Sequence, residues 1–359
     1  MYSSVLITGG AGFIGSNLAN FWKMEFPESQ VSVLDNLKRR GSELNLSRLR
    51  DAGIEYIHGD IRNPEDLELG QSFDLLIECS AEPSVLAGYG QSPAYLINTN
   101  LMGTVNCLEF ARKQEADLIF LSTSRVYPIK SINQLHYQED PNRFVLAENP
   151  DVPGVSSFGF SEAFPLNGSR SLYGATKLAS ELIMTEYIEM YDLRGIINRC
   201  GILTGPWQMG KVDQGVIVLW MAQHLFEGAL SYIGFGGLGK QVRDILHVSD
   251  LYELLKLQLK NLDQHNGKIY NVGGGLDHSL SLKELSEFCE SITGKHISIE
   301  SVPETRDADI PYYVSDCRKV QQATGWKPRH TLQSTLEEIS AWIEQHSSLL
   351  KPILMGEKN

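Results

Sequence analysis

The sequence has few cysteines, and their spacing does not indicate a disulfide framework or a zinc site. The five cysteines are scattered, odd in number and never arranged as Cys-x-x-Cys. Scattered thiols of this kind are typical of reduced, mostly buried cysteines in a cytosolic protein. We therefore expect reduced cysteines and no metal site.

The chain also lacks positive charge. It carries 31 Lys and Arg residues against 44 Asp and Glu residues, a formal net charge of −13. No large basic field is available to attract nucleic acid or an anionic membrane, so neither is expected as a partner. A small anionic ligand stays possible, because a single pocket can be locally basic.

Long hydrophobic runs are missing as well. No apolar stretch reaches membrane-spanning length, and Met1 leads into a strand-like segment within a few residues. We expect no signal peptide and a cytoplasmic location. The 359 residues are 42% hydrophobic and 21% charged, which suits one elaborated domain or two closely associated ones with a large core.

What the chain does contain is a glycine-rich turn near its start. An apolar run at 5–8 leads into Gly9, Gly12 and Gly15, and then into an amphipathic segment at 13–26. This order predicts a strand, a tight turn and the start of a helix, where free backbone N–H groups bind a pyrophosphate. Gly9 would allow the turn, Gly12 the approach of the phosphates, and Gly15 close packing of the helix on the strand.

An acidic residue follows at the distance that a dinucleotide site requires. Asp35 ends a second apolar run roughly twenty residues after the glycines and is placed to bind the ribose hydroxyls of an adenosine. Its carboxylate would repel a 2′-phosphate, so we expect NAD as cofactor and solvated side chains in the basic loop at 38–40. Asp60, at the end of a third run, could accept a hydrogen bond from the adenine amino group.

Strand-like and helix-like segments alternate over the first 200 residues. This alternation predicts an α/β fold with a Rossmann-type, doubly wound parallel sheet and a smaller C-terminal α/β substrate domain. The predicted strands include 54–60, 73–81, 117–124 and 195–200, and the predicted helices 98–113 and 171–190. We divide the chain into an NAD-binding domain at 1–200 and a mostly substrate-binding domain at 201–350 that interleaves with the sheet.

One connection in the first domain is unusually long. Residues 131–170 are polar and rich in proline and glycine, and we expect them to form an irregular insertion that covers the substrate side. Later in the chain, helices are predicted at 281–293 and 331–345, and a further helix is predicted to start at 246–250.

Tyr173 and Lys177 stand four residues apart, which places them on one face of a helix. A free tyrosine titrates near 10, so a base that works near pH 7 needs a pKa lowered by roughly three units, about 4 kcal/mol. The Lys177 cation and an oxidised nicotinamide would both lower that pKa. Thr123, at the end of a predicted strand, could donate to the same substrate oxygen.

Together these motifs resemble a known family. The segments TGGAGFIG (8–15), STSRVY (122–127) and YGATK (173–177) look like signatures of the extended short-chain dehydrogenases/reductases, within them the nucleotide-sugar epimerase and dehydratase branch. The likeness continues at 98–104, 241–250, 303–306 and 325–328. It implies bound NAD, a nucleotide-diphosphate sugar as substrate, and a homodimer or higher homo-oligomer.

The resemblance also implies the roles of particular residues. Thr123, Tyr173 and Lys177 would be catalytic. Cofactor contacts are expected from Gly9, Gly12, Phe13, Ile14, Gly15, Asp35, Asn36, Asp60, Ile61, Ser80, Ala81, Asn100, Tyr173 and Lys177. Substrate contacts are expected from Thr123, Asn198, Gln214, Gln241, Arg243 and Arg306, of which the two arginines match positions that meet the diphosphate or nucleoside.

Departures from the family pattern bear on the reaction. Dehydratases of this family carry an Asp-Glu pair after the active-site Thr, and decarboxylases usually a Glu at the second position, where this chain has Ser124 and Arg125. Epimerisation is therefore favoured. Asp213, Gln214 and Gly215 resemble a segment of the CDP-paratose 2-epimerases, which favours C2.

Several alternatives stay open. A C4 epimerase acting on a UDP-sugar is the main one, and the usual Tyr-Gly of the family is Tyr127-Pro128 here. A dehydratase, a decarboxylase, a reductase and a non-catalytic NAD-binding regulator are further ones.

Overall fold

The computed structural model describes residues 2–90, 92–149, 151–210 and 214–356. Within this part of the chain no helix is both long enough and apolar enough to cross a membrane. All five cysteines are free thiols, and four of them are buried, in agreement with the sequence.

The chain forms two compact units, each assembled from three segments. Unit 1 consists of Met1–Val126, Ser171–Cys200 and Leu251–Tyr270, and unit 2 of Tyr127–Arg170, Gly201–Asp250 and Asn271–Asn359. This division differs from the expected domains in two places. The insertion at 131–170 belongs to unit 2, and residues 251–270 belong to unit 1 because they pack on the sheet.

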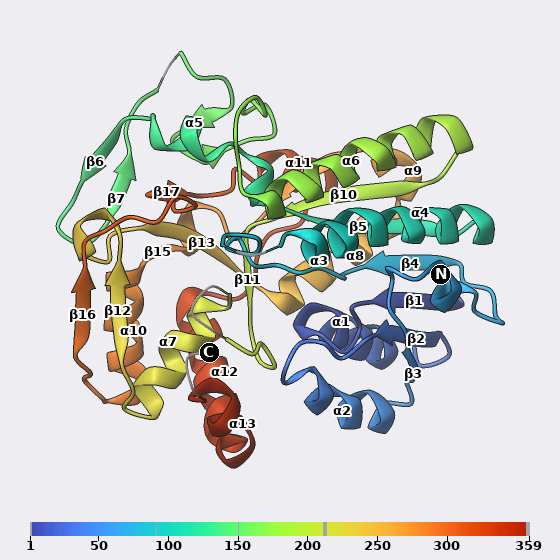
Figure 1. Ribbon diagram of the computed structural model, residues 1–359, viewed down its shortest axis with the longest axis horizontal. Helices are drawn as coiled ribbons and strands as arrows, with labels where there is room; N and C mark the ends of the chain where they lie inside the picture. The colour runs from blue at the N-terminus through green and yellow to red at the C-terminus, as the bar shows by residue number, and fades with distance from the viewer. Residues whose placement is uncertain (1, 91, 150, 211–213, 357–359) are drawn as a thin grey trace. The chain divides into compact units, whose positions relative to one another are not determined.

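Unit 1 is built around a seven-stranded sheet with the order β14-β10-β5-β4-β1-β2-β3 (Figure 1). The pairs from β3 across to β10 are all parallel. This confirms the predicted Rossmann-type fold. The strands are β1 (Ser4–Thr8), β2 (Gln30–Asp35), β3 (Glu55–His58), β4 (Leu75–Glu78), β5 (Asp117–Thr123), β10 (Gly195–Cys200) and β14 (Ile269–Val272).

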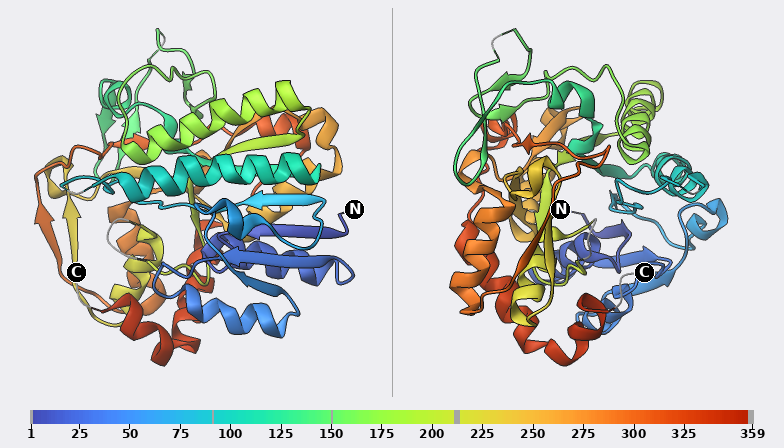
Figure 2. Two further views of the ribbon diagram at one scale, coloured as in Figure 1. Left: turned by 45° about the vertical axis from the view of Figure 1, so that its right-hand side comes forward. Right: turned by 60° about the vertical axis from the view of Figure 1, so that its left-hand side comes forward.

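Helices cover the sheet of unit 1. They are α1 (Phe13–Glu25), α2 (Asn45–Asp51), α3 (Ala94–Ile97), α4 (Gly103–Gln114), α6 (Leu172–Tyr191), α8 (Val248–Lys260) and α9 (Leu262–His265), with a π-helix at Asn98–Met102 before α4. Helices α4 and α6 lie side by side (Figures 1 and 2). Right-handed connections from β1 to β2 and from β4 to β5 run in opposite directions along the sheet, which puts α1 and α4 on opposite faces.

The direction in which successive strands are added to the sheet reverses between β1 and β4, although the strands themselves stay parallel. Strands β2 and β3 extend to one side of β1, whereas β4, β5 and β10 extend to the other. In open sheets of this type, ligands bind outside the carboxyl ends of the strands at such a switch point. The glycine turn after β1 and the loop after β4 both lie there.

Unit 2 is mainly composed of short elements. One mixed sheet has the order β11-β13-β15, with β17 paired to β13, and β12 and β16 form a separate parallel pair. The strands are β11 (Ile202–Thr204), β12 (Leu230–Ile233), β13 (Val242–His247), β15 (Ser279–Ser281), β16 (Ile299–Val302) and β17 (Tyr312–Tyr313). The helices are α5 (Ile129–Asn133), α7 (Val216–Leu225), α10 (Leu282–Thr293), α11 (Arg318–Thr324), α12 (Leu332–Gln345) and α13 (Ser347–Leu354).

One expectation for unit 2 needs correction and another is confirmed. The insertion is more regular than its composition suggested, with two antiparallel hairpins, β6 (Tyr137–Glu139) with β7 (Phe144–Leu146) and β8 (Val155–Ser156) with β9 (Gly159–Phe160). The helix expected to start at 246–250 does so: α8 begins at Val248, directly after His247, the last residue of β13. Short 3-10 turns lie at Ser42–Leu44, Pro64–Leu67, Ser124–Val126, Phe235–Gly237 and Leu276–His278.

Candidate active site

The glycine turn has the geometry of a phosphate cradle. Gly9 has a φ of +64°, and a Cβ there would lie 2.9 Å from the backbone of Cys79. Gly12 is the extended N-cap of α1, and none of the described side chains caps this helix end. The first N–H groups of a helix have no partner within the helix, so those of Phe13, Ile14 and Gly15 are placed to bind phosphate oxygens.

The third glycine of the motif packs differently from expectation. A Cβ on Gly15 would lie 2.4 Å from the carbonyl oxygen of Gly9, so Gly15 lets the helix approach the turn itself and not the strand. Gly10, which sequence reasoning passed over, is the residue that lies against β2. A Cβ on Gly10 would lie 2.3 Å from Cβ of Val33.

Asp35 is held beside this turn. Its carboxylate accepts hydrogen bonds from the N–H of Ala11 at 3.1 Å and of Leu37 at 2.8 Å. Burial raises the pKa of Asp35, and the N–H groups of Leu37, Ala11 and Gly12 oppose that rise. A half-buried carboxylate at this edge of the sheet fits the ribose contact proposed for it. Lys38 in the following loop is exposed, with its ammonium 4.0 Å from the ring centroid of Tyr95.

Asn36 and Asp60 are bonded to each other. The Asn36 amide donates to Asp60 at 2.8 Å, and Arg62 donates to both carboxylate oxygens at 2.9 and 2.6 Å. Burial alone would raise the pKa of Asp60, but the hydrogen bonds from Arg62 and Asn36 outweigh it and lower that pKa to about 2. The carboxylate is therefore charged, and an adenine contact would have to share it with Arg62.

Two of the expected cofactor residues support the fold around the site. Both polar atoms of the buried Asn100 amide bond the backbone of Glu82, at 2.8 and 3.1 Å, so this side chain holds the loop that follows β4. Ile61 is buried in a hydrophobic core cluster of unit 1. Ser80 and Ala81, by contrast, are half-buried directly after β4 at the switch point.

Thr123 and Tyr173 meet through their side chains. Thr123 ends β5 and Tyr173 lies in the first turn of α6, and the Thr123 side chain is close enough to lower the pKa of the Tyr173 phenol as a hydrogen-bond donor. Ser171 fixes the start of α6 because its side chain accepts a hydrogen bond from the N–H of Gly174. A proton acceptor and a hydrogen-bond donor are thus joined at the carboxyl edge of the sheet.

The electrostatics of Tyr173 differ from expectation. Burial raises the pKa of its phenol to about 12, although the Thr123 hydrogen bond and the Arg125 cation lower it. The polypeptide alone therefore keeps this tyrosine neutral, whereas we had expected a lowered pKa. A bound nicotinamide cation would act against the effect of burial.

Lys177 is buried one turn further along α6. Its ammonium lies 3.6 Å from the carboxylate of Glu78, the last residue of β4, and 4.1 Å from the ring centroid of Phe120. Burial raises the pKa of Glu78, and Lys177 opposes that rise. Sequence reasoning missed Glu78, although an acid at the end of an apolar run was a visible signal.

A second buried ion pair holds α6 against the sheet. Arg199 of β10 and Glu181 of α6 are 2.7 Å apart and almost inaccessible, and Ser122 of β5 donates to the same carboxylate. Sequence reasoning did not identify this cluster. It fixes the helix that carries Tyr173 and Lys177 to the two strands beneath it.

The expected substrate residues belong to different surroundings. Asn198 is fully buried in β10 and exchanges two hydrogen bonds with Gln258, at 2.9 and 2.8 Å, so its side chain serves the core of unit 1 and not a ligand. Arg243 donates to the carbonyl oxygens of Val242 and Ile310, at 2.7 and 2.8 Å. The bonds of Asn198 lie within unit 1, and those of Arg243 lie within unit 2.

The other expected substrate residues lie in unit 2. Arg306 is paired with Asp309 at 3.0 Å, and Gln241 donates to the carbonyl oxygen of Ile233 at 2.6 Å. Gln214 is half-buried, but Lys211, Val212 and Asp213 of the same motif lie outside the described residues. The Thr123, Tyr173 and Lys177 cluster belongs to unit 1.

Comparisons with known proteins agree with this geometry. Residues 5–273 match the NAD dependent epimerase/dehydratase family. The chain is 30% identical to CDP-paratose 2-epimerase of Salmonella typhi over 351 residues, 94% of this chain and 98% of that protein.

Solved structures of similar enzymes contain the cofactor. dTDP-glucose 4,6-dehydratase from Bacillus anthracis in complex with NAD is 26% identical with a TM-score of 0.77, covering 98% of this chain and 99% of that one. UDP-glucose 4-epimerase from Thermus thermophilus in complex with NAD is 26% identical with a TM-score of 0.74, covering 95% and 99%. The chain therefore belongs to the NAD-dependent epimerase/dehydratase family of extended short-chain dehydrogenases/reductases.

Proposed function

We propose that this enzyme is a nucleotide-sugar epimerase that inverts C2 of a CDP-linked deoxysugar. The observation that carries the proposal is the surroundings of the Thr123–Tyr173 pair. Arg125 stands two residues after Thr123, and its positive charge lowers the pKa of Tyr173. An acid at this position would help to expel water or carboxylate from a keto-sugar, and the chain provides a guanidinium in its place.

The proposed roles follow from the geometry in unit 1. NAD, when bound, supplies a reversible hydride acceptor. Tyr173 takes the proton from the reacting hydroxyl group and later returns it, and Thr123 holds the same oxygen by a hydrogen bond. Lys177, one turn further along the same helix, is proposed to bind the nicotinamide ribose. Because no acid–base pair favours elimination, the oxidised sugar recovers the hydride on its other face.

The proposed cofactor contacts come from the same edge of the sheet. The N–H groups at the start of α1 bind the pyrophosphate, Asp35 binds the adenosine ribose, and Ser80 and Ala81 leave room across the strand ends. In unit 2, Arg243 and Arg306 are proposed to bind the diphosphate, for which a planar guanidinium offers paired donors.

A C4 epimerase acting on a UDP-sugar is the second candidate. Its support is the similarity to UDP-glucose 4-epimerase over almost the whole chain. Support for the C2 reaction comes from the similarity to CDP-paratose 2-epimerase and from Gln214 in the segment that resembles those enzymes.

A substrate panel tests the proposal. The purified protein with NAD is incubated separately with CDP-paratose, UDP-glucose and dTDP-glucose, and products are identified by NMR. We expect conversion of CDP-paratose with no net change in NAD, and deuterium placed at C2 should stay in the product. Conversion of UDP-glucose to its C4 epimer would support the second candidate, loss of water would indicate a dehydratase, and no turnover of any sugar would favour a regulator.

A further inference from the structure

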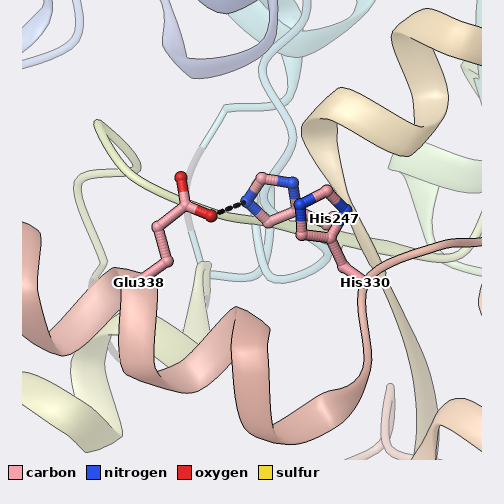
Figure 3. Close-up of side chains that lie close together, drawn as sticks. All are labelled: His247, His330 and Glu338. Carbon is pink, nitrogen blue, oxygen red and sulfur yellow. Dashed lines mark ion pairs between the residues drawn. The ribbon is translucent and has the colours of Figure 1, made fainter.

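A cluster of potential metal ligands lies in unit 2, apart from the residues assigned to NAD or sugar. His247 ends β13, His330 precedes α12, and Glu338 lies on α12 (Figure 3). One nitrogen of each histidine and one carboxylate oxygen lie within 4.8 Å of one another. The carboxylate is directed at His247, whose Nε2 is 3.4 Å from Oε2 of Glu338, and the ring of His330 lies over that of His247.

The Nε2 atom of His247 is the unusual feature. His247 is only 4% exposed, and its Nε2 has no hydrogen-bond partner among the described residues. Gly205 keeps the space beside this atom open, because a Cβ there would lie 3.0 Å from Nε2. A buried nitrogen that makes no hydrogen bond is costly, and a cation shared with the nearby Glu338 carboxylate is one way to satisfy it.

The other nitrogen of each ring is already held. Nδ1 of His247 is 2.7 Å from Oγ of Ser249 and accepts a hydrogen bond from the Ser249 N–H at 3.3 Å, and Nδ1 of His330 is 3.1 Å from the carboxylate of Asp250. In metal-binding histidines a partner of the second nitrogen fixes the ring and directs the other nitrogen at the metal, and a carboxylate such as that of Asp250 is a usual partner. Asp250 also accepts from the N–H groups of Arg329 and His330, at 3.1 Å each, and so fixes the loop that carries His330.

We propose that His247, His330 and Glu338 bind one divalent transition-metal ion, with Zn²⁺ as the best match. Two imidazoles and one carboxylate are the ligands that zinc prefers, whereas Mg²⁺ and Ca²⁺ favour oxygen alone. The fourth position of a tetrahedral site is left for water.

Binding requires a small local closure. Bonds of about 2.0–2.1 Å in a tetrahedron put ligand atoms about 3.3 Å apart. The distance of 3.4 Å from Nε2 of His247 to Oε2 of Glu338 already fits, so it is the His330 nitrogen that has to be brought to this spacing. The rings stack with their planes 25° apart, and a metal must lie in both planes, so one ring has to turn. His330 and Glu338 are the more exposed ligands and supply this movement, while the buried His247 stays in place. The ion would then link the end of β13 to α12.

Metal titration of the full-length protein tests this proposal. After removal of metal by a chelator, Zn²⁺ binding is measured by calorimetry, and Co²⁺ is added separately to record the visible absorption of a four-coordinate site. We expect one Zn²⁺ per chain and a higher melting temperature with Zn²⁺. His330→Asn and Glu338→Gln should each weaken binding at least tenfold and abolish the thermal shift.

Matched variants separate a built site from surface binding. Glu337→Gln removes the same charge from the neighbouring position of α12 and should bind Zn²⁺ as the wild type does. Ser249→Ala should weaken binding by about tenfold, because it removes the partner of the His247 ring. The proposal is overturned if the wild type binds no Zn²⁺, or if His330→Asn and Glu338→Gln bind it as tightly as the Glu337→Gln control.

Discussion

The ammonium of Lys177 lies 3.6 Å from the carboxylate of Glu78, and both side chains are buried. The pair joins α6, the helix that also carries Tyr173, to the end of β4. Charges removed from water are costly unless each compensates the other, and removal of one partner leaves the other unpaired. Glu78 therefore belongs to the structure of the site even though it is not proposed to touch the sugar.

The first prediction concerns this pair. Glu78→Gln keeps the size of the side chain but leaves Lys177 without its counter-charge, so the free energy of unfolding should fall by about 3–5 kcal/mol. Urea denaturation measures the loss. The control is Glu109→Gln, which breaks the more exposed pair with Arg112 and should cost about 0–1 kcal/mol. Equally small effects would mean that Glu78 is protonated and forms no ion pair.

The second prediction concerns the proposed acid–base group. Tyr173→Phe removes the phenolic oxygen and keeps the ring, so NAD binding and folding should survive while kcat falls by about 10²–10⁴-fold. Tyr187→Phe is the control on the same helix, since Tyr187 bonds Glu109 on the surface of α4. A Tyr173→Phe variant with more than about half of the wild-type rate would exclude the proton-transfer role.

The third prediction concerns pH. Because burial raises the pKa of Tyr173 to about 12, the neutral phenol dominates at lower pH, and activity should increase as the pH rises. Arg125→Gln removes a cation that lowers this pKa, so the rising limb of the pH–rate profile should move to higher pH. Lys113→Gln removes a charge from the last turn of α4 and should leave the profile unchanged. A profile that is identical in Arg125→Gln and wild type would argue against Tyr173 as the titrating group.

The raised pKa of Tyr173 also affects the pH dependence of stability. A group whose pKa is higher in the folded state stabilises the protein fully below its unfolded pKa, about 10 for tyrosine. That contribution is lost as the pH rises through about 12. Wild type should therefore lose more stability than Tyr173→Phe between about pH 10 and 12, as urea denaturation over that range would show.

The fourth prediction concerns the cofactor. Asp35→Asn keeps an acceptor for the N–H of Ala11 but removes the negative charge, so the preference for NAD over NADP should decrease. Binding of both cofactors is measured by calorimetry, with Asp51→Asn on the surface of α2 as the control. If wild type bound NADP more tightly than NAD, the basic residues at 38–40 would be the specificity residues instead.

Local motifs were readable from the sequence because their parts are close along the chain. The turn at Gly9, the acid at the end of β2 and the four-residue spacing of Tyr173 and Lys177 depend on backbone periodicity, and the alternation of segments determined the Rossmann-type sheet. The family followed from the same motifs. For these local motifs and for the fold, the sequence alone was sufficient. Local conformation follows from nearby residues, and the switch point follows from the order of strands and helices.

Tertiary structure decided what depends on distant residues and on burial. Glu78 and Lys177 meet only because β4 and α6 pack together, and the raised pKa of Tyr173 comes from burial that no spacing reveals. Asn198 was expected at the substrate and lies against Gln258 in the core. His247, His330 and Glu338 come from three segments that no local motif connects, so a sequence without paired cysteines predicted no metal site. The physical reason is common to all four: pairwise electrostatics and desolvation depend on positions in space, which only the folded chain determines.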